Sequence, residues 1–185
     1  MNLSNLKQHE ILNELYIQAC GDLLPAYGLE INIREQGAGT GTRGESSSYI
    51  SILGATGDGI NVSSVLNIDR DLVLRTHPTG STDLSQEDLE DWCRELNNQL
   101  VGRLKNKLLG FGHVLIMGLP ILITGTNVRP VAAPDSEVHE YCVEAGEGKM
   151  TLTLVTLVSP HIVFHGVEAL ENEEALLFEG DIALF

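Results

Sequence analysis

Glu95, Asn98 and Gly102 follow one another at spacings of three and four residues, in a segment whose apolar residues recur with a helical period. At about 100° per residue they share one helix face with Asp91 and Lys105. The opposite face carries apolar side chains, those of Leu89, Trp92, Leu96, Leu100 and Leu104. A carboxylate can pair with a partner's cation, and an amide can donate to one oxygen while it accepts from a water. The missing side chain of Gly102 would let another molecule approach the helix closely.

The same residues can also be an ordinary solvated helix face that happens to contain a glycine, because polar stripes are common on surface helices. The glycine costs such a helix about 1 kcal/mol relative to alanine. The residue types therefore make Glu95 and Asn98 a candidate site, but they do not assign it a reaction.

A second pattern lies in residues 39–44, which match the G-x-G-x-x-G dinucleotide fingerprint and follow a predicted strand. That fingerprint works only when a helix follows, since the pyrophosphate sits on the amides of a helix N-terminus. Residues 45–50 lead into a strand instead, which favours a flexible hairpin loop. A small-molecule binding module built on residues 37–44 would need the helix that the pattern lacks.

The sequence contains little that indicates a metal site, a disulfide framework or a serine nucleophile. Among six histidines only His161 and His165 are close in sequence, and no third ligand is spaced to complete a metal site. The three cysteines, Cys20, Cys93 and Cys142, form no C-x-x-C pair and read as reduced, half-buried thiols. The G-x-S-x-G signature is absent. We expect no metal site and no cofactor of the protein's own.

The charge balance argues against nucleic acids and anionic membranes as partners. The chain has 185 residues, 26 of them acidic and 11 basic, and a formal net charge of −15. It starts without the pattern of a signal peptide, so a cytoplasmic location is expected. The apolar run 108–125 contains a histidine, a proline and several glycines, and it breaks at Gly118-Leu119-Pro120. We interpret it as strands of a core sheet and not as a membrane span.

The pattern of elements predicts one α+β domain over residues 1–185, with two long helices packed on a mostly antiparallel sheet. Helices are expected at 4–24, 70–76 and 85–109, the last with a capping box formed by Ser85 and Asp88. Strands are expected at 29–34, 49–54, 60–68, 113–117, 121–125, 138–143 and 150–158. Residues 159–185 read as a C-terminal extension that adds further strand from residue 161.

The segment Glu95-Leu96-Asn97-Asn98-Gln99-Leu100-Val101-Gly102 resembles the E-x-x-N-x-x-x-G signature of the CheC/CheX/FliY chemotaxis phosphatases. The resemblance continues into Lys105-Asn106-Lys107-Leu108, the glycine-bounded apolar strand that follows, and then Leu119-Pro120-Ile121-Leu122-Ile123-Thr124-Gly125. Upstream, the strand pair within residues 49–68, with Gly57 and Gly59 at its turn, is similar to the family's hairpin. Most of residues 1–158 is covered, and the tail beyond is not.

The resemblance implies a phosphatase that acts on a phospho-aspartyl CheY-type response regulator. In the family's scheme Glu95 would dock the regulator by pairing with its active-site lysine, and Asn98 would position the attacking water. Asp91, Gly102 and Arg103 would contact the partner around these two residues. The magnesium ion would belong to the regulator, and the chain would form a homodimer through sheet edges.

The sequence departs from the family pattern at Arg103, where the residue after the motif glycine is commonly asparagine. The first helix contains Glu10-Ile11-Leu12-Asn13, but Ile17 stands where a second motif glycine would fall. We therefore interpret the protein as the single-motif, CheX-like type. The alternative is a non-catalytic interaction domain of the same fold that binds a response regulator or a flagellar-switch-like assembly.

Overall fold

Seven antiparallel strands form one sheet in the computed structural model, which describes residues 7–29, 34–36, 48–57, 59–125, 132–145 and 148–165. The helices are α1 (Gln8–Leu23), α2 (Arg70–Thr76) and α3 (Gln86–Gly110), and a 3-10 turn, η2 (Leu24–Tyr27), follows α1. The strands are β1 (Arg34–Gln36), β2 (Ser48–Gly57), β3 (Ile60–Asp69), β4 (Ile116–Met117), β5 (Ile121–Gly125), β6 (Glu137–Ala145) and β7 (Gly148–Val158). Their order is β1-β6-β7-β3-β2-β4, and β5 also pairs with β2. The predicted α+β class and antiparallel sheet are confirmed.

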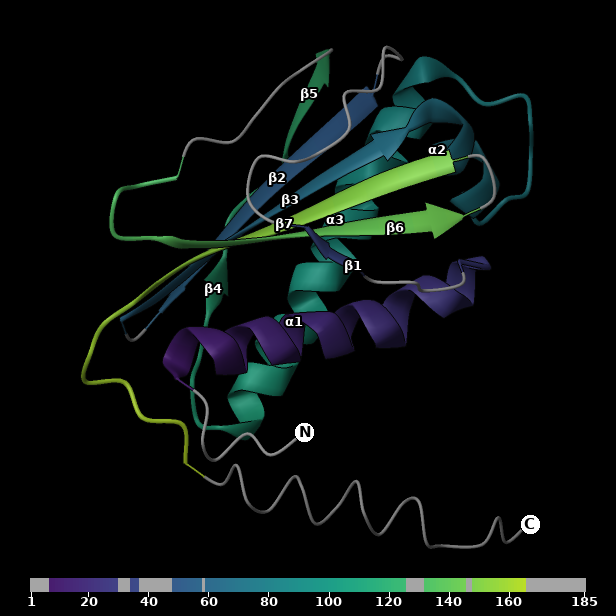
Figure 1. The fold of residues 1–185 in the computed structure, drawn as a ribbon. Helices are drawn as coiled ribbons and strands as arrows, with labels where there is room; N and C mark the ends of the chain where they lie inside the picture. Colours follow the sequence, from purple (N-terminus) through teal and green to yellow (C-terminus); the bar gives the residue numbers. More distant parts are fainter. Residues whose placement is uncertain are drawn as a thin grey trace, which may run out of the picture.

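Both long helices lie on one face of the sheet (Figure 1). On α1 the buried residues recur at helical spacing, as in Leu12, Leu15 and Ala19. On α3 the apolar positions expected from the sequence are all buried: Leu89, Trp92, Leu96, Leu100 and Leu104. Alternate strand residues meet them, and the described residues share one hydrophobic core. This packing fixes which face of α3 is turned outward.

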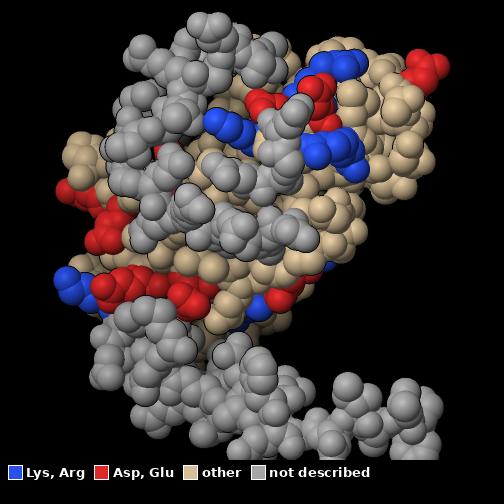
Figure 2. Space-filling view, turned by 45° about the vertical axis from the view of Figure 1, so that its right-hand side comes forward, with Lys and Arg blue, Asp and Glu red and all other residues tan. Residues whose placement is uncertain are grey.

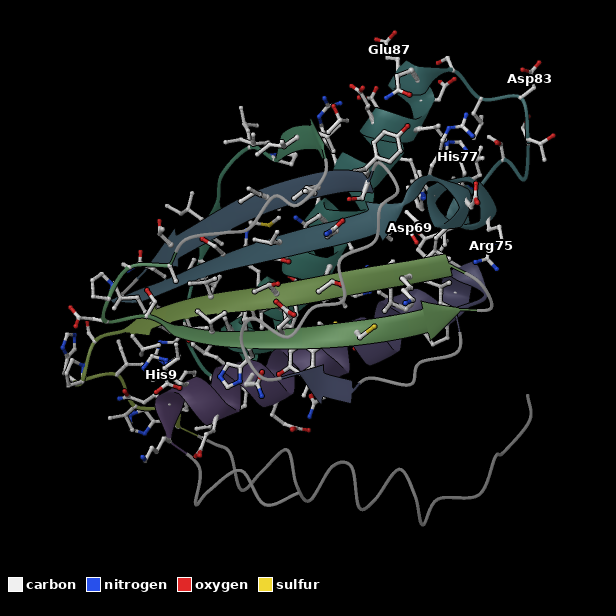
Figure 3. All side chains as sticks on the ribbon, turned by 45° about the horizontal axis from the view of Figure 1, so that its top comes forward. His9, Asp69, Arg75, His77, Asp83 and Glu87 are labelled. Atoms are coloured by element: carbon white, nitrogen blue, oxygen red, sulfur yellow. The ribbon has the colours of Figure 1, made fainter. Side chains whose placement is uncertain are left out.

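The capping box at the start of α3 is confirmed. The backbone N–H of Asp88 donates to Oγ of Ser85 at 3.1 Å, and the backbone N–H of Ser85 donates to Oδ2 of Asp88 at 2.9 Å. The Ser85 side chain and backbone N–H lower the pKa of the Asp88 carboxyl below its ordinary value. Asp83 and Glu87 lie close to this end of the helix, as does His77 at the end of α2 (Figure 3). The first turn of α3 is therefore fixed by local hydrogen bonds as well as by the core.

The first third of the chain differs from the prediction in its boundaries. The first helix ends at Leu23, and η2, which contains Pro25, continues it as a tighter turn closed by Gly28 at φ 72°. Residues 4–6 and 30–33 lie outside the described residues, so of the strand expected at 29–34 only Arg34 falls in a described strand, β1 (Arg34–Gln36). The hairpin strands extend to Gly57 on one side and begin at Ile60 on the other, which makes the turn tighter than predicted.

The strand predicted at 113–117 is reduced to Ile116–Met117. A Cβ on Gly57 would overlap the Val114 carbonyl oxygen, so the chain before β4 crosses close over the end of β2. Pairing with β2 begins only beyond this crossing, at Ile116 and Met117. The strand predicted from residue 161 onward is also wrong over 161–165, which form a turn and an irregular stretch. Residues 166–185 lie outside the described part of the chain.

Within the apolar run 108–125, residues 116–117 and 121–125 form strands at the edge of the sheet, whereas residues 108–110 are the end of α3. Leu108, Phe111 and Leu115 are buried in the core. The interpretation of the whole run as strands of a core sheet is therefore wrong for its helical start and for the place of its strands. The break at Gly118-Leu119-Pro120 separates β4 from β5, and both strands pair with the free side of β2. Several of its side chains are exposed, with Ile116 at 73%, Leu119 at 88% and Ile121 at 63%. In the described residues no helix is long and apolar enough to cross a membrane.

Candidate active site

Glu95 and Asn98 are neighbours on the outward face of α3. Glu95 is exposed and Asn98 is partly exposed. Nδ2 of Asn98 lies 3.4 Å from Oε2 of Glu95, a long and weak hydrogen bond that a partner can readily replace. Among the described residues, a Cβ built on Gly102 would meet nothing within 4 Å, so the space beside these two side chains is open. The structure thus brings together a carboxylate, an amide and a clear approach to the helix.

Gln99 and Tyr27 extend this site on one side. Nε2 of Gln99 donates to Oε1 of Glu95 at 2.9 Å, and the Tyr27 hydroxyl donates to Oε1 of Gln99 at 2.8 Å. Tyr27 belongs to η2, and its ring meets Trp92 edge-on with centroids 5.0 Å apart. The two oxygens of Glu95 therefore accept from two different amides. Sequence analysis missed both Gln99 and Tyr27 as members of the site.

Asn97 holds α3 to the sheet behind the site. It is fully buried, and its Nδ2 donates to the backbone carbonyls of Ser51 at 3.0 Å and Ser64 at 3.2 Å. Its Oδ1 accepts from Oγ of Ser64 at 2.7 Å, and that hydroxyl also contacts the Tyr16 hydroxyl at 2.8 Å. Buried polar groups need such partners, and these partners are specific to one rotation of the helix. A polar residue on the apolar side of a predicted helix was the signal for this network.

Asp91 and Arg103, which the resemblance assigns to partner contacts, flank the site on different sides. Asp91 is exposed and accepts from Nη1 of Arg94 at 2.6 Å. Exposed ion pairs of this kind contribute at most about 1 kcal/mol, so Asp91 stays available to a partner. Nη1 of Arg103 donates to the backbone carbonyl of Gln99 at 3.3 Å, which turns this side chain back along the helix toward Gln99.

The surface shown in Figure 2 mixes both signs of charge, with Lys and Arg side chains beside Asp and Glu. No continuous basic surface is visible among the described residues on that face. This agrees with the acidic net charge of −15.

In the second motif-like copy, the side chains of Glu10 and Asn13 both make hydrogen bonds within the protein. Glu10 accepts from the backbone N–H of Lys7 at 2.6 Å and caps α1, while Oδ1 of Asn13 accepts from the Tyr141 hydroxyl. Within the described residues no group of three or more His, Cys, Asp and Glu side chains is placed to hold a metal ion. His161 and His165 lie in the stretch after β7, and the loop 37–44 lies outside the described residues.

The cysteines are more buried than the sequence suggested. Cys20, Cys93 and Cys142 are all buried, and none forms a disulfide. Burial raises the pKa of both the Cys20 and Cys93 thiols to about 12, so neither supplies a thiolate nucleophile near neutral pH.

Comparisons with known proteins identify the fold. No family model and no curated protein matches the sequence. The chemotaxis protein CheX from Vibrio vulnificus superposes with a TM-score of 0.62 at 16% identity, covering 78% of this chain and 95% of that one. A CheC-like superfamily protein from Shewanella sp. PV-4 gives a TM-score of 0.63 at 15% identity, covering 78% and 96%. The chain has the fold of these CheC-like and CheX proteins, as the resemblance implied.

Two further structures relate this fold to assemblies. CheX from Borrelia burgdorferi, solved as a CheX-CheY complex with BeF3 and Mg, matches with a TM-score of 0.59 at 18% identity, covering 80% of this chain and 98% of that one. The FliM middle domain from H. pylori matches with a TM-score of 0.51 at 12% identity, covering 82% and 94%. The architecture is therefore shared with a protein that binds CheY and with a FliM domain.

Proposed function

We propose that the protein is a phosphatase of the CheX-like type that dephosphorylates a phospho-aspartyl CheY-type response regulator. The observation that carries the proposal is the pairing of Glu95 with Asn98 on the open outer face of α3, within a CheX-like fold. The E-x-x-N-x-x-x-G pattern and the CheX-CheY complex of Borrelia burgdorferi support it. The regulator would bring its own Mg²⁺, and the protein would work in the cytoplasm without a cofactor of its own.

Asn98 would position the water. In the proposed reaction a water attacks phosphorus in line, the P–O bond to the regulator's aspartate breaks, and inorganic phosphate and a free carboxylate result. Phosphoryl transfer of this kind depends mainly on positioning and charge stabilisation, so an amide that cannot act as a base is sufficient. Oδ1 would accept from the water and Nδ2 would donate to a phosphoryl oxygen. The 3.4 Å contact to Glu95 is weak enough to be exchanged for these bonds.

Glu95 would dock the regulator through a lysine side chain. Its carboxylate is exposed, and Gln99 holds one oxygen while the other lies 3.4 Å from Nδ2 of Asn98. A charge pair at this place would speed encounter and set orientation. Asp91 and Arg103 would contact the regulator on either side of Glu95. Because Gly102 has no side chain, the regulator could approach the helix backbone closely there.

Self-association through the β4–β5 edge is part of the same proposal. β5 pairs with β2 on one side, and the exposed side chains of Ile116, Leu119 and Ile121 gather at this edge. The whole stretch 108–128 contains no charged residue, in a chain of net charge −15. Exposed apolar edge strands invite pairing with another strand, and a second copy offers the same uncharged surface.

The experiment is phosphate release from phosphorylated CheY-type regulators of the same organism. Asn98→Ala should slow stimulated release by about two orders of magnitude, the scale of removing one positioned polar group. Binding of the phosphorylated regulator should largely survive. Asn106→Ala is the matched control, because Asn106 is an exposed asparagine on the same helix. If wild type accelerates release and Asn98→Ala does so equally well, the site assignment is wrong.

The FliM similarity favours a second candidate, a non-catalytic domain that binds a regulator or a switch-like assembly. Arg103 supports this alternative, because its side chain turns toward Gln99 where the family pattern commonly has asparagine. The same assay separates the two. A protein that binds a phosphorylated regulator and accelerates no release would be the interaction domain.

A further inference from the structure

We infer that Tyr27 and Gln99 are positioning residues that hold the Glu95 carboxylate in its docking orientation. This inference rests on the proposed function. The relay runs from the Tyr27 hydroxyl to Oε1 of Gln99 over 2.8 Å, and from Nε2 of Gln99 to Oε1 of Glu95 over 2.9 Å. Both distances are typical of good hydrogen bonds.

The direction of the relay follows from the chemistry of its ends. An ionised carboxylate only accepts hydrogen bonds, so Gln99 must present its amide nitrogen to Glu95. The carbonyl oxygen of Gln99 then faces Tyr27, whose hydroxyl must donate to it. A reversed amide would place two acceptors against each other at Glu95. The carboxylate therefore selects the amide orientation, and the tyrosine hydroxyl stabilises it by donating to the amide oxygen.

The anchor of the relay is less exposed than its outer end. The Tyr27–Gln99 bond is partly buried, whereas the Gln99–Glu95 bond is exposed. The Tyr27 ring meets Trp92 edge-on at 5.0 Å, and Nε1 of Trp92 donates to Oγ1 of Thr76 at 3.0 Å. Without this anchor Gln99 and Glu95 would be two free, rotamer-rich side chains. Ordering such a side chain at an interface costs about 0.5–1.5 kcal/mol, equivalent to about a 2- to 10-fold change in affinity.

The same helix contains a second relay of identical chemistry that lies away from the site. The Tyr49 hydroxyl donates to Oε1 of Gln86 at 2.9 Å, and Nε2 of Gln86 donates to Oε1 of Glu90 at 2.9 Å. Glu90 lies on a different side of α3 from Glu95, four residues after its glutamine and not four before. Substitutions of Tyr49 and Gln86 reproduce the loss of a Tyr–Gln–Glu relay and leave the contacts of Glu95 and Gln99 in place. Glu90 also pairs with Arg94 at 3.6 Å, which links this control relay to Asp91 through one ion pair.

The test compares Tyr27→Phe and Gln99→Met with Tyr49→Phe and Gln86→Met. In phosphate release, the first pair should raise the half-saturating regulator concentration about 2- to 10-fold with kcat nearly retained. Asn98→Ala should instead lower kcat. Tyr49→Phe and Gln86→Met should leave both parameters at wild-type values. In a Glu95→Ala background, Tyr27→Phe should have no further effect, because the group it positions is gone.

Three results would overturn the inference. Tyr27→Phe could leave the half-saturating concentration unchanged while Asn98→Ala is inactive. The effects of Tyr27→Phe and Glu95→Ala could add fully. Tyr49→Phe could act as strongly as Tyr27→Phe, which would point to general weakening of α3. In each case the phosphatase assignment itself would still stand.

A measurement without regulator tests the relay even if the proposed phosphatase activity fails. The side-chain amide protons of Gln99 should shift in NMR spectra when Glu95→Gln removes the charged acceptor. They should shift similarly in Tyr27→Phe and not in Tyr49→Phe. If the chemical shifts of the Gln99 side-chain amide protons are the same in Glu95→Gln, Tyr27→Phe and wild type, the relay is excluded.

Discussion

The Asn97 side chain is fully buried, whereas the adjacent Asn98 side chain lies on the outer face within 3.4 Å of Glu95. Successive residues of a helix differ by about 100°, so a single turn of α3 serves two purposes here. Asn97 fixes the rotation of the helix on Ser51 and Ser64, and that rotation leaves Asn98 on the outer face.

Removing Asn97 should therefore destabilise the fold. Asn97→Ala removes the acceptor of the Ser64 hydroxyl and a donor to two buried carbonyls, which costs about 1–3 kcal/mol. Asn98→Ala, at a partly exposed position, should change stability by less than about 0.5 kcal/mol. Urea unfolding of the two variants gives the comparison. Equal stability of Asn97→Ala and Asn98→Ala would show that the buried network does not hold the helix.

Gly102→Ala should separate stability from function. The added methyl meets no atom of the described part of the chain within 4 Å, and alanine favours a helix by about 1 kcal/mol over glycine. The variant should be more stable and yet bind the regulator less well, because the methyl occupies the open approach. Gly21→Ala is the control, since Gly21 lies in α1 with equally open space. It should stabilise the protein without loss of activity, and full activity in Gly102→Ala would remove the role proposed for that glycine.

The capping box should make stability depend on pH at the start of α3. Hydrogen bonds from Ser85 depress the Asp88 pKa in the folded state. Such a carboxylate stabilises the fold above its unfolded pKa, and this contribution is lost as the pH falls through the folded pKa. Urea midpoints of wild type and Asp88→Asn should thus differ at pH 7 and converge in acid. Asp83→Asn, just before the helix, serves as control, and a constant gap between Asp88→Asn and wild type would contradict the cap's role.

The proposed dimer can be tested by one charge at the sheet edge. Light scattering should give a dimer for wild type and a monomer for Ile121→Lys, because a lysine at this 63% exposed position introduces charge into an uncharged surface. Leu157→Lys, on β7 away from this edge and 40% exposed, should leave the dimer intact. A wild-type monomer at high concentration would refute the dimer outright.

Local signals accounted for the elements that were predicted well. The capping box of Ser85 and Asp88 sets the start of α3, and Pro120 sets the start of β5 at Ile121, so both were predicted nearly to the residue. β4 was predicted too long because its start is set by the close approach of Val114 to Gly57. These two residues lie far apart in the sequence, so local signals do not show the approach.

The same distinction applies to the candidate site. The proximity of Glu95 and Asn98 follows from helical periodicity alone, and the geometry agrees with it. The contribution of Tyr27 does not follow from helical periodicity. Tyr27 lies 72 positions before Gln99, and the packing of η2 against α3 brings the two side chains together. Asn97 was recognisable in principle as a polar residue on an apolar face, but its serine partners depend on strand register.

β3 and β7 pair at the centre of the sheet, with partners from Ile68–Met150 to Ile60–Val158, which are 82 and 98 positions apart. Closing so long a loop costs chain entropy before any contact repays it, and folds rich in such contacts form in milliseconds to seconds. All of α3 lies inside this loop, and the spacing of Glu95 and Asn98 along the helix needs none of these distant contacts. Refolding kinetics should accordingly be slowed by Leu152→Ala on β7 more than by Leu100→Ala on α3. The reverse order would mean that the helix, and not the central strand pair, limits folding.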